Sequence, residues 1–133
     1  MLKLEIVTPE KRVLDAEVDS VTVPTASGEA GILPNHAPLV SALKPGVLSY
    51  TTHGTTDKIA ITGGFVEVND NKVAVLADAA QTAAEVDVPA ARAEHDAAEK
   101  ELAANAAAPL EETEAIRDRV ESANAKLQLA GGK

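Results

Sequence analysis

The sequence predicts a β + α protein, in which an N-terminal antiparallel β-sandwich or flattened barrel is followed by a C-terminal antiparallel α-helical hairpin. Two contrasts along the chain indicate this fold. Residues 1–84 hold five of the seven prolines, six of the eight glycines and several short β-branched runs, whereas residues 85–133 are rich in Ala and Glu. A length of 133 residues fits one domain with an appendage. We therefore expect two parts, 1–84 and 85–133.

Short apolar runs separated by Gly and Pro are typical of the first part. Residues 2–6 alternate between apolar and charged side chains, the period-2 pattern of a half-buried strand. A second run, 18–23, is expected to stop at Pro24. Further strands are expected at 39–43, 47–52, 58–62, 65–68 and 73–77. Many short strands between turns indicate a sandwich or a barrel.

The clearest hairpin joins GGFVEV to KVAVLAD through residues 69–71. Asn and Asp tolerate left-handed backbone conformations, and both flanking runs alternate. The preceding Gly63 and Gly64 lack the Gly-Lys-Ser/Thr ending of a phosphate loop and are not followed by a helix. We expect a β-bulge or tight bend there.

The second part has helical signals. Asp87 is placed to cap a helix, and Pro89 suits its first turn, so we expect a helix through 90–104. Asn105 and Pro109 mark a break. A second helix is expected from Leu110 to about residue 129, ending at Gly131 and Gly132, and the short break favours an antiparallel pair.

We expect this hairpin to be held mainly by the large aliphatic side chains Leu102, Ile116, Val120 and Leu127. Burying one such side chain contributes roughly 1.5–3 kcal/mol, and an Ala far less. That gain barely offsets the entropy lost in ordering about 40 residues. Two interpretations stay open: a loosely docked hairpin that rearranges, or a surface hairpin that never moves.

Composition excludes several classes of function. A net charge of −9 disfavours nonspecific binding to nucleic acid or anionic lipid. The absence of cysteine excludes disulfides and thiol chemistry. Neither a signal peptide nor a membrane span is expected, so we expect a soluble, intracellular chain. His36, His53 and His95 share no ligand spacing, which disfavours a metal-dependent or hydrolytic enzyme.

Two segments carry a resemblance to a known family. The runs GEAGILPNHAPLVSALKPGVL and IAITGGFVEVNDNKVAVLAD closely resemble the epsilon subunits of F-type ATP synthases of bacterial or chloroplast type. The opening residues and the β-then-hairpin order fit the same family, so the resemblance covers the whole chain. It implies a non-catalytic rotor part of the central stalk, which couples proton flow to ATP synthesis. It also implies a hairpin that folds down or extends and then inhibits ATP hydrolysis.

The resemblance also implies partners and contact residues. Glu29 matches the residue that meets the polar loops of the c-ring, and Thr8 and His36 match positions that face the gamma subunit. In the extended hairpin, the basic residues Arg117, Arg119 and Lys126 would contact the beta subunit of the catalytic alpha/beta head. All of these are interface roles, with no catalytic residue and no metal.

The chain departs from the family in its ATP-binding motif. Some members bind ATP through Ile/Leu-Asp-x-x-Arg-Ala, but here the stretch is VDVPAA, with Asp87 in place and Ala90 at the arginine position. Arg92 follows two residues later, about 200° further round a helix. We expect ATP binding, through Asp87 and Arg92, to be weak or absent.

Inhibition is also expected to be weak, because acidic residues outnumber basic ones in the second helix. Membrane association is expected only through the complex. The expected location is the cytoplasmic face of the plasma membrane, or the thylakoid membrane for a plastid gene. The alternative function is a free-standing nucleotide-sensing module that uses a groove between the sandwich and the hairpin.

Overall fold

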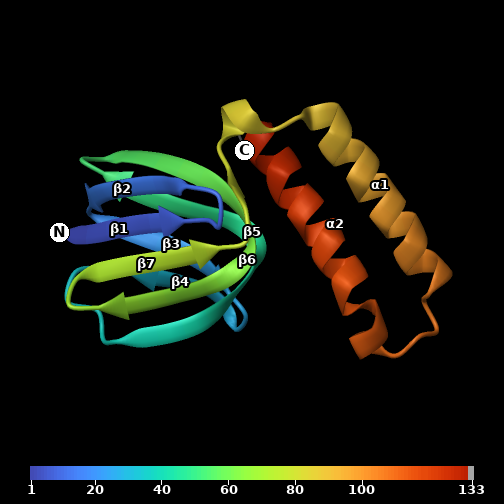
Figure 1. Cartoon of the computed structure of the whole chain (residues 1–133), viewed down its shortest axis with the longest axis horizontal. Helices are drawn as coiled ribbons and strands as arrows, with labels where there is room; N and C mark the ends of the chain where they lie inside the picture. The colour runs from blue at the N-terminus through green and yellow to red at the C-terminus, as the bar shows by residue number, and fades with distance from the viewer. Residues whose placement is uncertain (132–133) are drawn as a thin grey trace.

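The computed structural model describes residues 1–131 and places three layers in sequence across the molecule (Figure 1). The β-sandwich lies at one end, α2 packs against it, and α1 lies on the far side of α2. The N-terminus lies at the end of the sandwich remote from the helices. The predicted order of a sandwich followed by two helices is confirmed.

The strands occupy most of the first 81 residues. Their bounds are β1 Leu2–Val7, β2 Arg12–Val18, β3 Ser20–Thr25, β4 Gly28–Ile32, β5 Leu39–Thr52, β6 Thr55–Asn69, β7 Lys72–Ala77 and β8 Ala80–Gln81. A 3₁₀ turn, η1, spans Ala83–Glu85. The helices are α1 Val88–Ala104 and α2 Leu110–Ala130.

The strands form one open sheet that folds over on itself. Its order is β2-β1-β7-β6-β5-β3-β4, with β8 paired to β6. The path is not closed, so the fold is a sandwich with β2 and β4 at its edges. The pairs are antiparallel apart from β1 and β7, which run parallel with Leu4 opposite Val73.

The longest strands, β5 and β6, run through both layers of the β-sandwich. The predicted runs 39–43 and 47–52 form one strand, and so do 58–62 and 65–68, because backbone pairing continues through the Pro and Gly residues between them. Gly63 and Gly64 have φ values of 122° and 115°, which bend β6 as expected. A Cβ on Gly64 would overlap the Leu76 carbonyl oxygen of β7, so only glycine allows this close approach.

The prediction for residues 18–24 is wrong in two respects. A break at Asp19 separates β2 from β3, and β3 continues through Pro24. The register between β3 and β5 is interrupted between Thr22 and Thr25, and Pro24 lies in that interruption. Proline lacks an N–H and is tolerated at such irregularities. A Cβ on Gly46 would lie 2.9 Å from the Cβ of Pro24, so the ring packs against that glycine.

The core of the sandwich is aliphatic. Leu2, Leu4 and Ile6 are each 0% exposed, as their alternation predicts. They pack with inward-facing residues of the other strands in one cluster. The predicted hairpin between β6 and β7 is also confirmed, because Asp70 and Asn71 form its turn with φ values of 49° and 60°.

Helix α1 begins where its predicted cap places it. The Asp87 carboxylate accepts a hydrogen bond from the Ala90 amide at 3.1 Å, and Pro89 lies in the first turn. At the end of α2, the Gly131 amide donates to the Leu127 carbonyl at 3.0 Å. The predicted stop at Gly132 lies outside the described residues.

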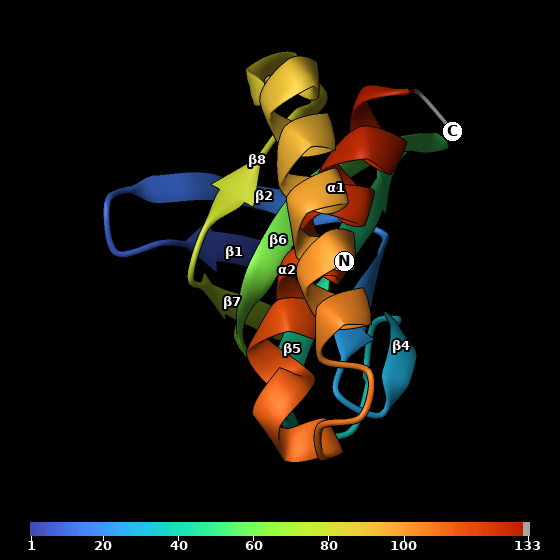
Figure 2. The same cartoon turned by 90° about the vertical axis from the view of Figure 1, so that its right-hand side faces the viewer.

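The hairpin packs through small side chains. On α2, Ala123, Ala125 and Leu129 are buried, whereas Ile116, Val120 and Leu127, the residues expected to hold the hairpin, are only half-buried. Seen end-on, α1 lies over α2, and α2 lies between α1 and the strands (Figure 2). A separate small cluster joins the hairpin to the sandwich: Ala60, Ala125 and Leu129, with Val47 and Val86.

The bend at Gly64 yields a prediction. Gly64→Ala should lower the free energy of unfolding by roughly 2–4 kcal/mol, because the methyl group adds both backbone strain and overlap with β7. Chemical denaturation followed by circular dichroism measures this change. The matched control is Gly31→Ala on the edge strand β4, where no heavy atom lies within 4 Å of an added Cβ. Equal stability of the two variants would contradict the role of Gly64.

Candidate functional site

An apolar surface lies on the outer side of the sheet. Phe65 of β6 and Leu76 of β7 are directly opposite each other and are 59% and 57% exposed. Their register partners are Ala42 of β5 and Val7 of β1, and Val40 on β5 is 71% exposed. We call these five residues the outer apolar face. Four of them are exposed and Val7 is half-buried, and a contiguous apolar surface of this kind marks an interaction site.

The hairpin leaves the outer apolar face uncovered. α2 packs on β5 at Val47 and on β6 at Ala60, which precedes the bend at Gly63 and Gly64. Figure 1 shows the helices at one end of the sandwich, away from the broad side of β7 and β6. The surface is therefore available to a partner while the hairpin is docked.

Thr8 borders this face. It lines a shallow depression of about 360 Å³ together with Phe65, Leu76 and neighbouring residues of β1 and β7. Its hydroxyl donates to the Lys11 carbonyl at 3.2 Å, and its amide donates to the same oxygen at 2.9 Å. These bonds hold the β1–β2 turn, so Thr8 is a fixed point on the rim of the depression.

Glu29 and His36 lie elsewhere on the sandwich. Glu29 is exposed on the edge strand β4, opposite Pro24. His36 is half-buried in the β4–β5 connection, with Nδ1 2.7 Å from the Ala37 carbonyl. That connection is anchored by the Asn35 amide, which donates to Oδ1 of Asn71 at 2.6 Å. The structure does not gather Thr8, Glu29 and His36 into one site.

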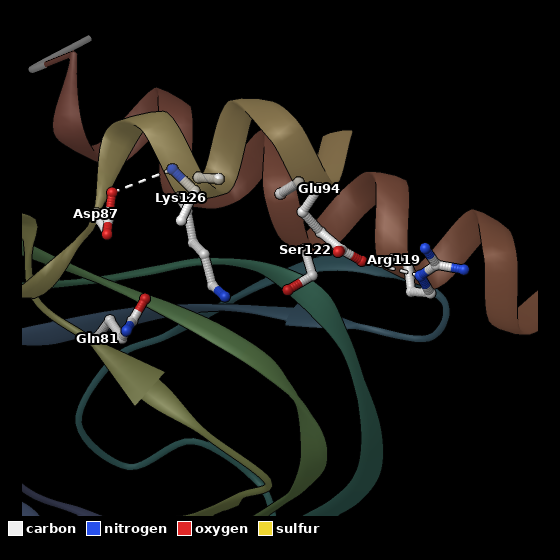
Figure 3. A pocket seen from close by; sticks show the side chains of 9 residues that line it. Gln81, Asp87, Glu94, Arg119, Ser122 and Lys126 are labelled. Carbon is white, nitrogen blue, oxygen red and sulfur yellow. Dashed lines mark hydrogen bonds and ion pairs between the residues drawn. The ribbon is translucent and has the colours of Figure 1, made fainter. Parts of the chain in front are cut away.

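A cavity of about 380 Å³ opens between β8 and the two helices. Figure 3 shows Lys126 extending toward the strands, with its amine between Gln81 and Ser122. Asp87 and Ala90 line this cavity, but Arg92 does not. The structure therefore separates the two residues that the degenerate ATP motif paired, and Lys126 and Arg119 are the cations that line the cavity instead.

Two of the three basic residues predicted on α2 are engaged within the hairpin. Arg117 donates to the Leu110 carbonyl at 2.6 Å and to the Thr113 hydroxyl at 3.3 Å, both on its own helix. Arg119 pairs across to α1, with Glu94 at 2.9 Å and Glu101 at 2.6 Å. Hydrogen bonds to these two glutamates raise the pKa of Arg119.

A polar link ties the sandwich to the start of the hairpin. The Thr82 amide donates to the Glu85 carboxylate at 3.0 Å, and its hydroxyl lies 3.1 Å from the same oxygen. These bonds, followed by the charge of Lys11 at 3.6 Å, lower the pKa of Glu85. The ionised carboxylate thereby connects the β1–β2 turn to η1.

Within residues 1–131, no group of three His, Asp or Glu side chains is placed to hold a metal ion. In the same part of the chain, no helix has the length and apolar character needed to cross a membrane.

Comparison with known proteins identifies the family. Residues 1–83 match the β-sandwich domain of the ATP synthase delta/epsilon chain. The ATP synthase epsilon chain of Desulfitobacterium hafniense (strain Y51) is 52% identical over 99 residues, covering 74% of this chain and 75% of the relative. The chain belongs to the ATP synthase epsilon chain family. The ATP synthase epsilon chain of Nitratidesulfovibrio vulgaris (strain DP4) is 44% identical over 128 residues, covering 96% of this chain and 87% of the relative.

Solved structures agree with this membership. A chain of the Euglena gracilis mitochondrial ATP synthase, in a structure of OSCP, F1 and the c-ring, superposes with a TM-score of 0.72 at 28% identity. The match covers 98% of this chain and 79% of that one. A chain of the Tetrahymena thermophila central stalk and c-ring has a TM-score of 0.56 at 22% identity, covering 64% and 69%, and shows the shared fold. As an epsilon chain, the protein is a subunit of the ATP synthase complex.

Sequence reasoning missed the outer apolar face, although a signal for it was present. Phe65 is the sole phenylalanine of the chain, and it alternates with Val66 and Val68. Both valines are buried, so the strand period directs Phe65 outward. An aromatic on the outward side of a strand is a signal of an interface.

Proposed function

We propose that this chain is a non-catalytic rotor subunit of the central stalk, which helps to couple ion flow to ATP synthesis. Family membership supports this role, together with a match over 98% of the chain to a component of a rotary ATP synthase. The subunit would be a peripheral part of the membrane-bound complex. Its expected location is the cytoplasmic face of the plasma membrane, or the thylakoid membrane for a plastid gene.

The outer apolar face is the observation that carries the proposal. A stalk subunit must hold a neighbour firmly enough to turn with it, and buried apolar contact provides such a grip. Phe65 and Leu76 are exposed here, and Thr8 borders them. We therefore assign this face to the gamma subunit, with Thr8 at its rim and His36 as a further contact.

Glu29 is proposed to contact the c-ring. It is exposed on the edge strand β4, where its carboxylate is available to polar or basic groups of another subunit. Complementary charge at such a rim contributes orientation more than affinity. The two proposed partners would thus use different parts of the sandwich.

We propose that residues 1–84 bind the other subunits of the stalk, and that residues 85–133 regulate ATP hydrolysis. Contact between α2 and the beta subunit of the alpha/beta head would use Arg117, Arg119 and Lys126. The first two are already bonded within the hairpin, and the surrounding helix is acidic. Inhibition of ATP hydrolysis should therefore be weak.

The alternative, a nucleotide-sensing module, is favoured only by the cavity beside α1. Its lining includes Asp87 and two cations, but Ala90 stands where an arginine would reach a phosphate. Without that guanidinium, ATP would have fewer charge-assisted hydrogen bonds. We propose that ATP binds weakly and is not required for the stalk role.

The gamma assignment predicts an effect of the outer apolar face on binding. Phe65→Ser and Leu76→Ser should each raise the Kd for the isolated gamma subunit by roughly 10- to 100-fold, because each removes one apolar side chain that the complex would bury. Isothermal titration calorimetry measures the Kd. The matched control is Leu110→Ser, because Leu110 is 73% exposed but lies on the hairpin. Unchanged binding by both sheet variants would refute the assignment.

Removal of the hairpin tests its regulatory strength. A chain lacking residues 88–133 should still bind gamma. The ATPase rate of the reassembled catalytic head should rise by less than roughly five-fold, because an inhibitory contact worth one exposed ion pair changes a rate by no more than that. Steady-state ATPase assays compare the truncated and full-length chains. A much larger rise in rate would show that inhibition is strong.

The cavity yields a prediction about ATP. Ala90→Arg should lower the Kd for ATP by about 10-fold or more, because it places a guanidinium in the cavity lining. The control is Ala93→Arg, an exposed position of α1 that does not line the cavity. Titration calorimetry with ATP compares both with the original chain. Tight binding by the original chain would instead favour the nucleotide-sensing function.

A further inference from the structure

The two buried sides of α2 differ in chemistry. Toward the sandwich, α2 presents Ala125 and Leu129 to Ala60 and Val47. Across residues 1–131, no ion pair or side-chain hydrogen bond joins α2 to a strand. This contact is therefore apolar and should change little with ionic strength.

Toward α1, the contact combines alanines with one charged residue. Ala91 and Ala98 of α1 and Ala123 of α2 are buried. Arg119 reaches Glu94 with Nε at 2.9 Å and Glu101 with Nη1 at 2.6 Å. The two glutamates are seven residues apart, so one guanidinium spans two turns of α1.

Within residues 1–131, the ion pairs that join α1 to another helix or strand are the two made by Arg119. The remaining close contacts of α1 with carboxylates join His95 to Asp96 and Glu99, which lie on the same helix. Since α1 rests mainly on α2 and buried alanines contribute little, even the modest contribution of two exposed ion pairs matters for holding it.

We propose that Arg119 is an intramolecular clamp: its two ion pairs hold α1 against α2, and their loss lets α1 separate while α2 stays on the sandwich. The proposal follows from the described residues, in which the ion pairs of α2 point toward α1 and its apolar cluster faces the strands. The clamp is a property of the isolated chain and goes beyond the stalk role.

Distance measurements between spin labels test the clamp. The chain has no cysteine, so introduced cysteines are the sole labelling sites. One pair, Ala93→Cys with Asn124→Cys, uses exposed positions on α1 and α2 and reports their separation. A second pair, Lys72→Cys with Asn124→Cys, reports the separation of α2 from β7.

In Arg119→Gln, the ratio of long to short interhelical distances should rise roughly two- to ten-fold, as expected for loss of two exposed ion pairs. About 1 M salt should produce a similar rise in the original chain, because it screens both pairs. The distance from α2 to β7 should not change in either case. Circular dichroism confirms that the variant stays helical.

Arg92→Gln is the matched control, because Arg92 is an exposed arginine of α1. Glu94→Gln and Glu101→Gln should each give a smaller rise than Arg119→Gln, since each removes one of two bonds. The clamp is overturned if Arg119→Gln has the distances of the original chain, or if Arg92→Gln opens the helices equally. It is also overturned if α2 moves away from β7 together with α1.

Discussion

The close approach of β6 to β7 at Gly64 is the constraint on which the arrangement of this molecule depends. Because a side chain there would overlap the Leu76 carbonyl, glycine permits β6 to bend while its pairing with β5 continues. The bend places one half of each long strand in each layer. Ala60, which precedes the bend, receives α2, whereas Phe65, on the other half, faces outward. A single backbone feature thus separates the surface for the hairpin from the surface offered to a partner.

Small side chains determine how firmly the hairpin is held. Ala60 and Ala125 meet Leu129 in a cluster separate from the main core, so the sandwich does not need the helices to complete its own packing. Between the helices, buried alanines allow close approach but contribute little free energy. Charged contacts therefore have more influence on the stability of the hairpin than on that of the sandwich, where the buried side chains are almost all aliphatic.

The internal pairing of the basic residues connects conformation with recognition. Arg119 satisfies Glu94 and Glu101 in the docked hairpin, and Arg117 satisfies carbonyl and hydroxyl groups of its own helix. An acidic surface of another subunit would have to compete with these bonds. Lys126 has a different environment, since it lines the cavity beside Ser122 and Gln81. Three residues that look alike in sequence therefore have three different surroundings.

Local patterns in the sequence determined the alternation that buries Leu2 and Leu4, the turn at Asp70, the cap at Asp87 and, through two motifs, the family. Each of these depends on neighbouring residues along the chain, so sequence alone suffices. Tertiary structure decided what depends on distant residues. Pro24 lies within a strand because β5 does not pair with it there, Arg92 misses the cavity that Lys126 lines, and Arg119 finds its partners 18 and 25 residues away. No periodicity reports such contacts, because they arise only once the helices and strands have packed together.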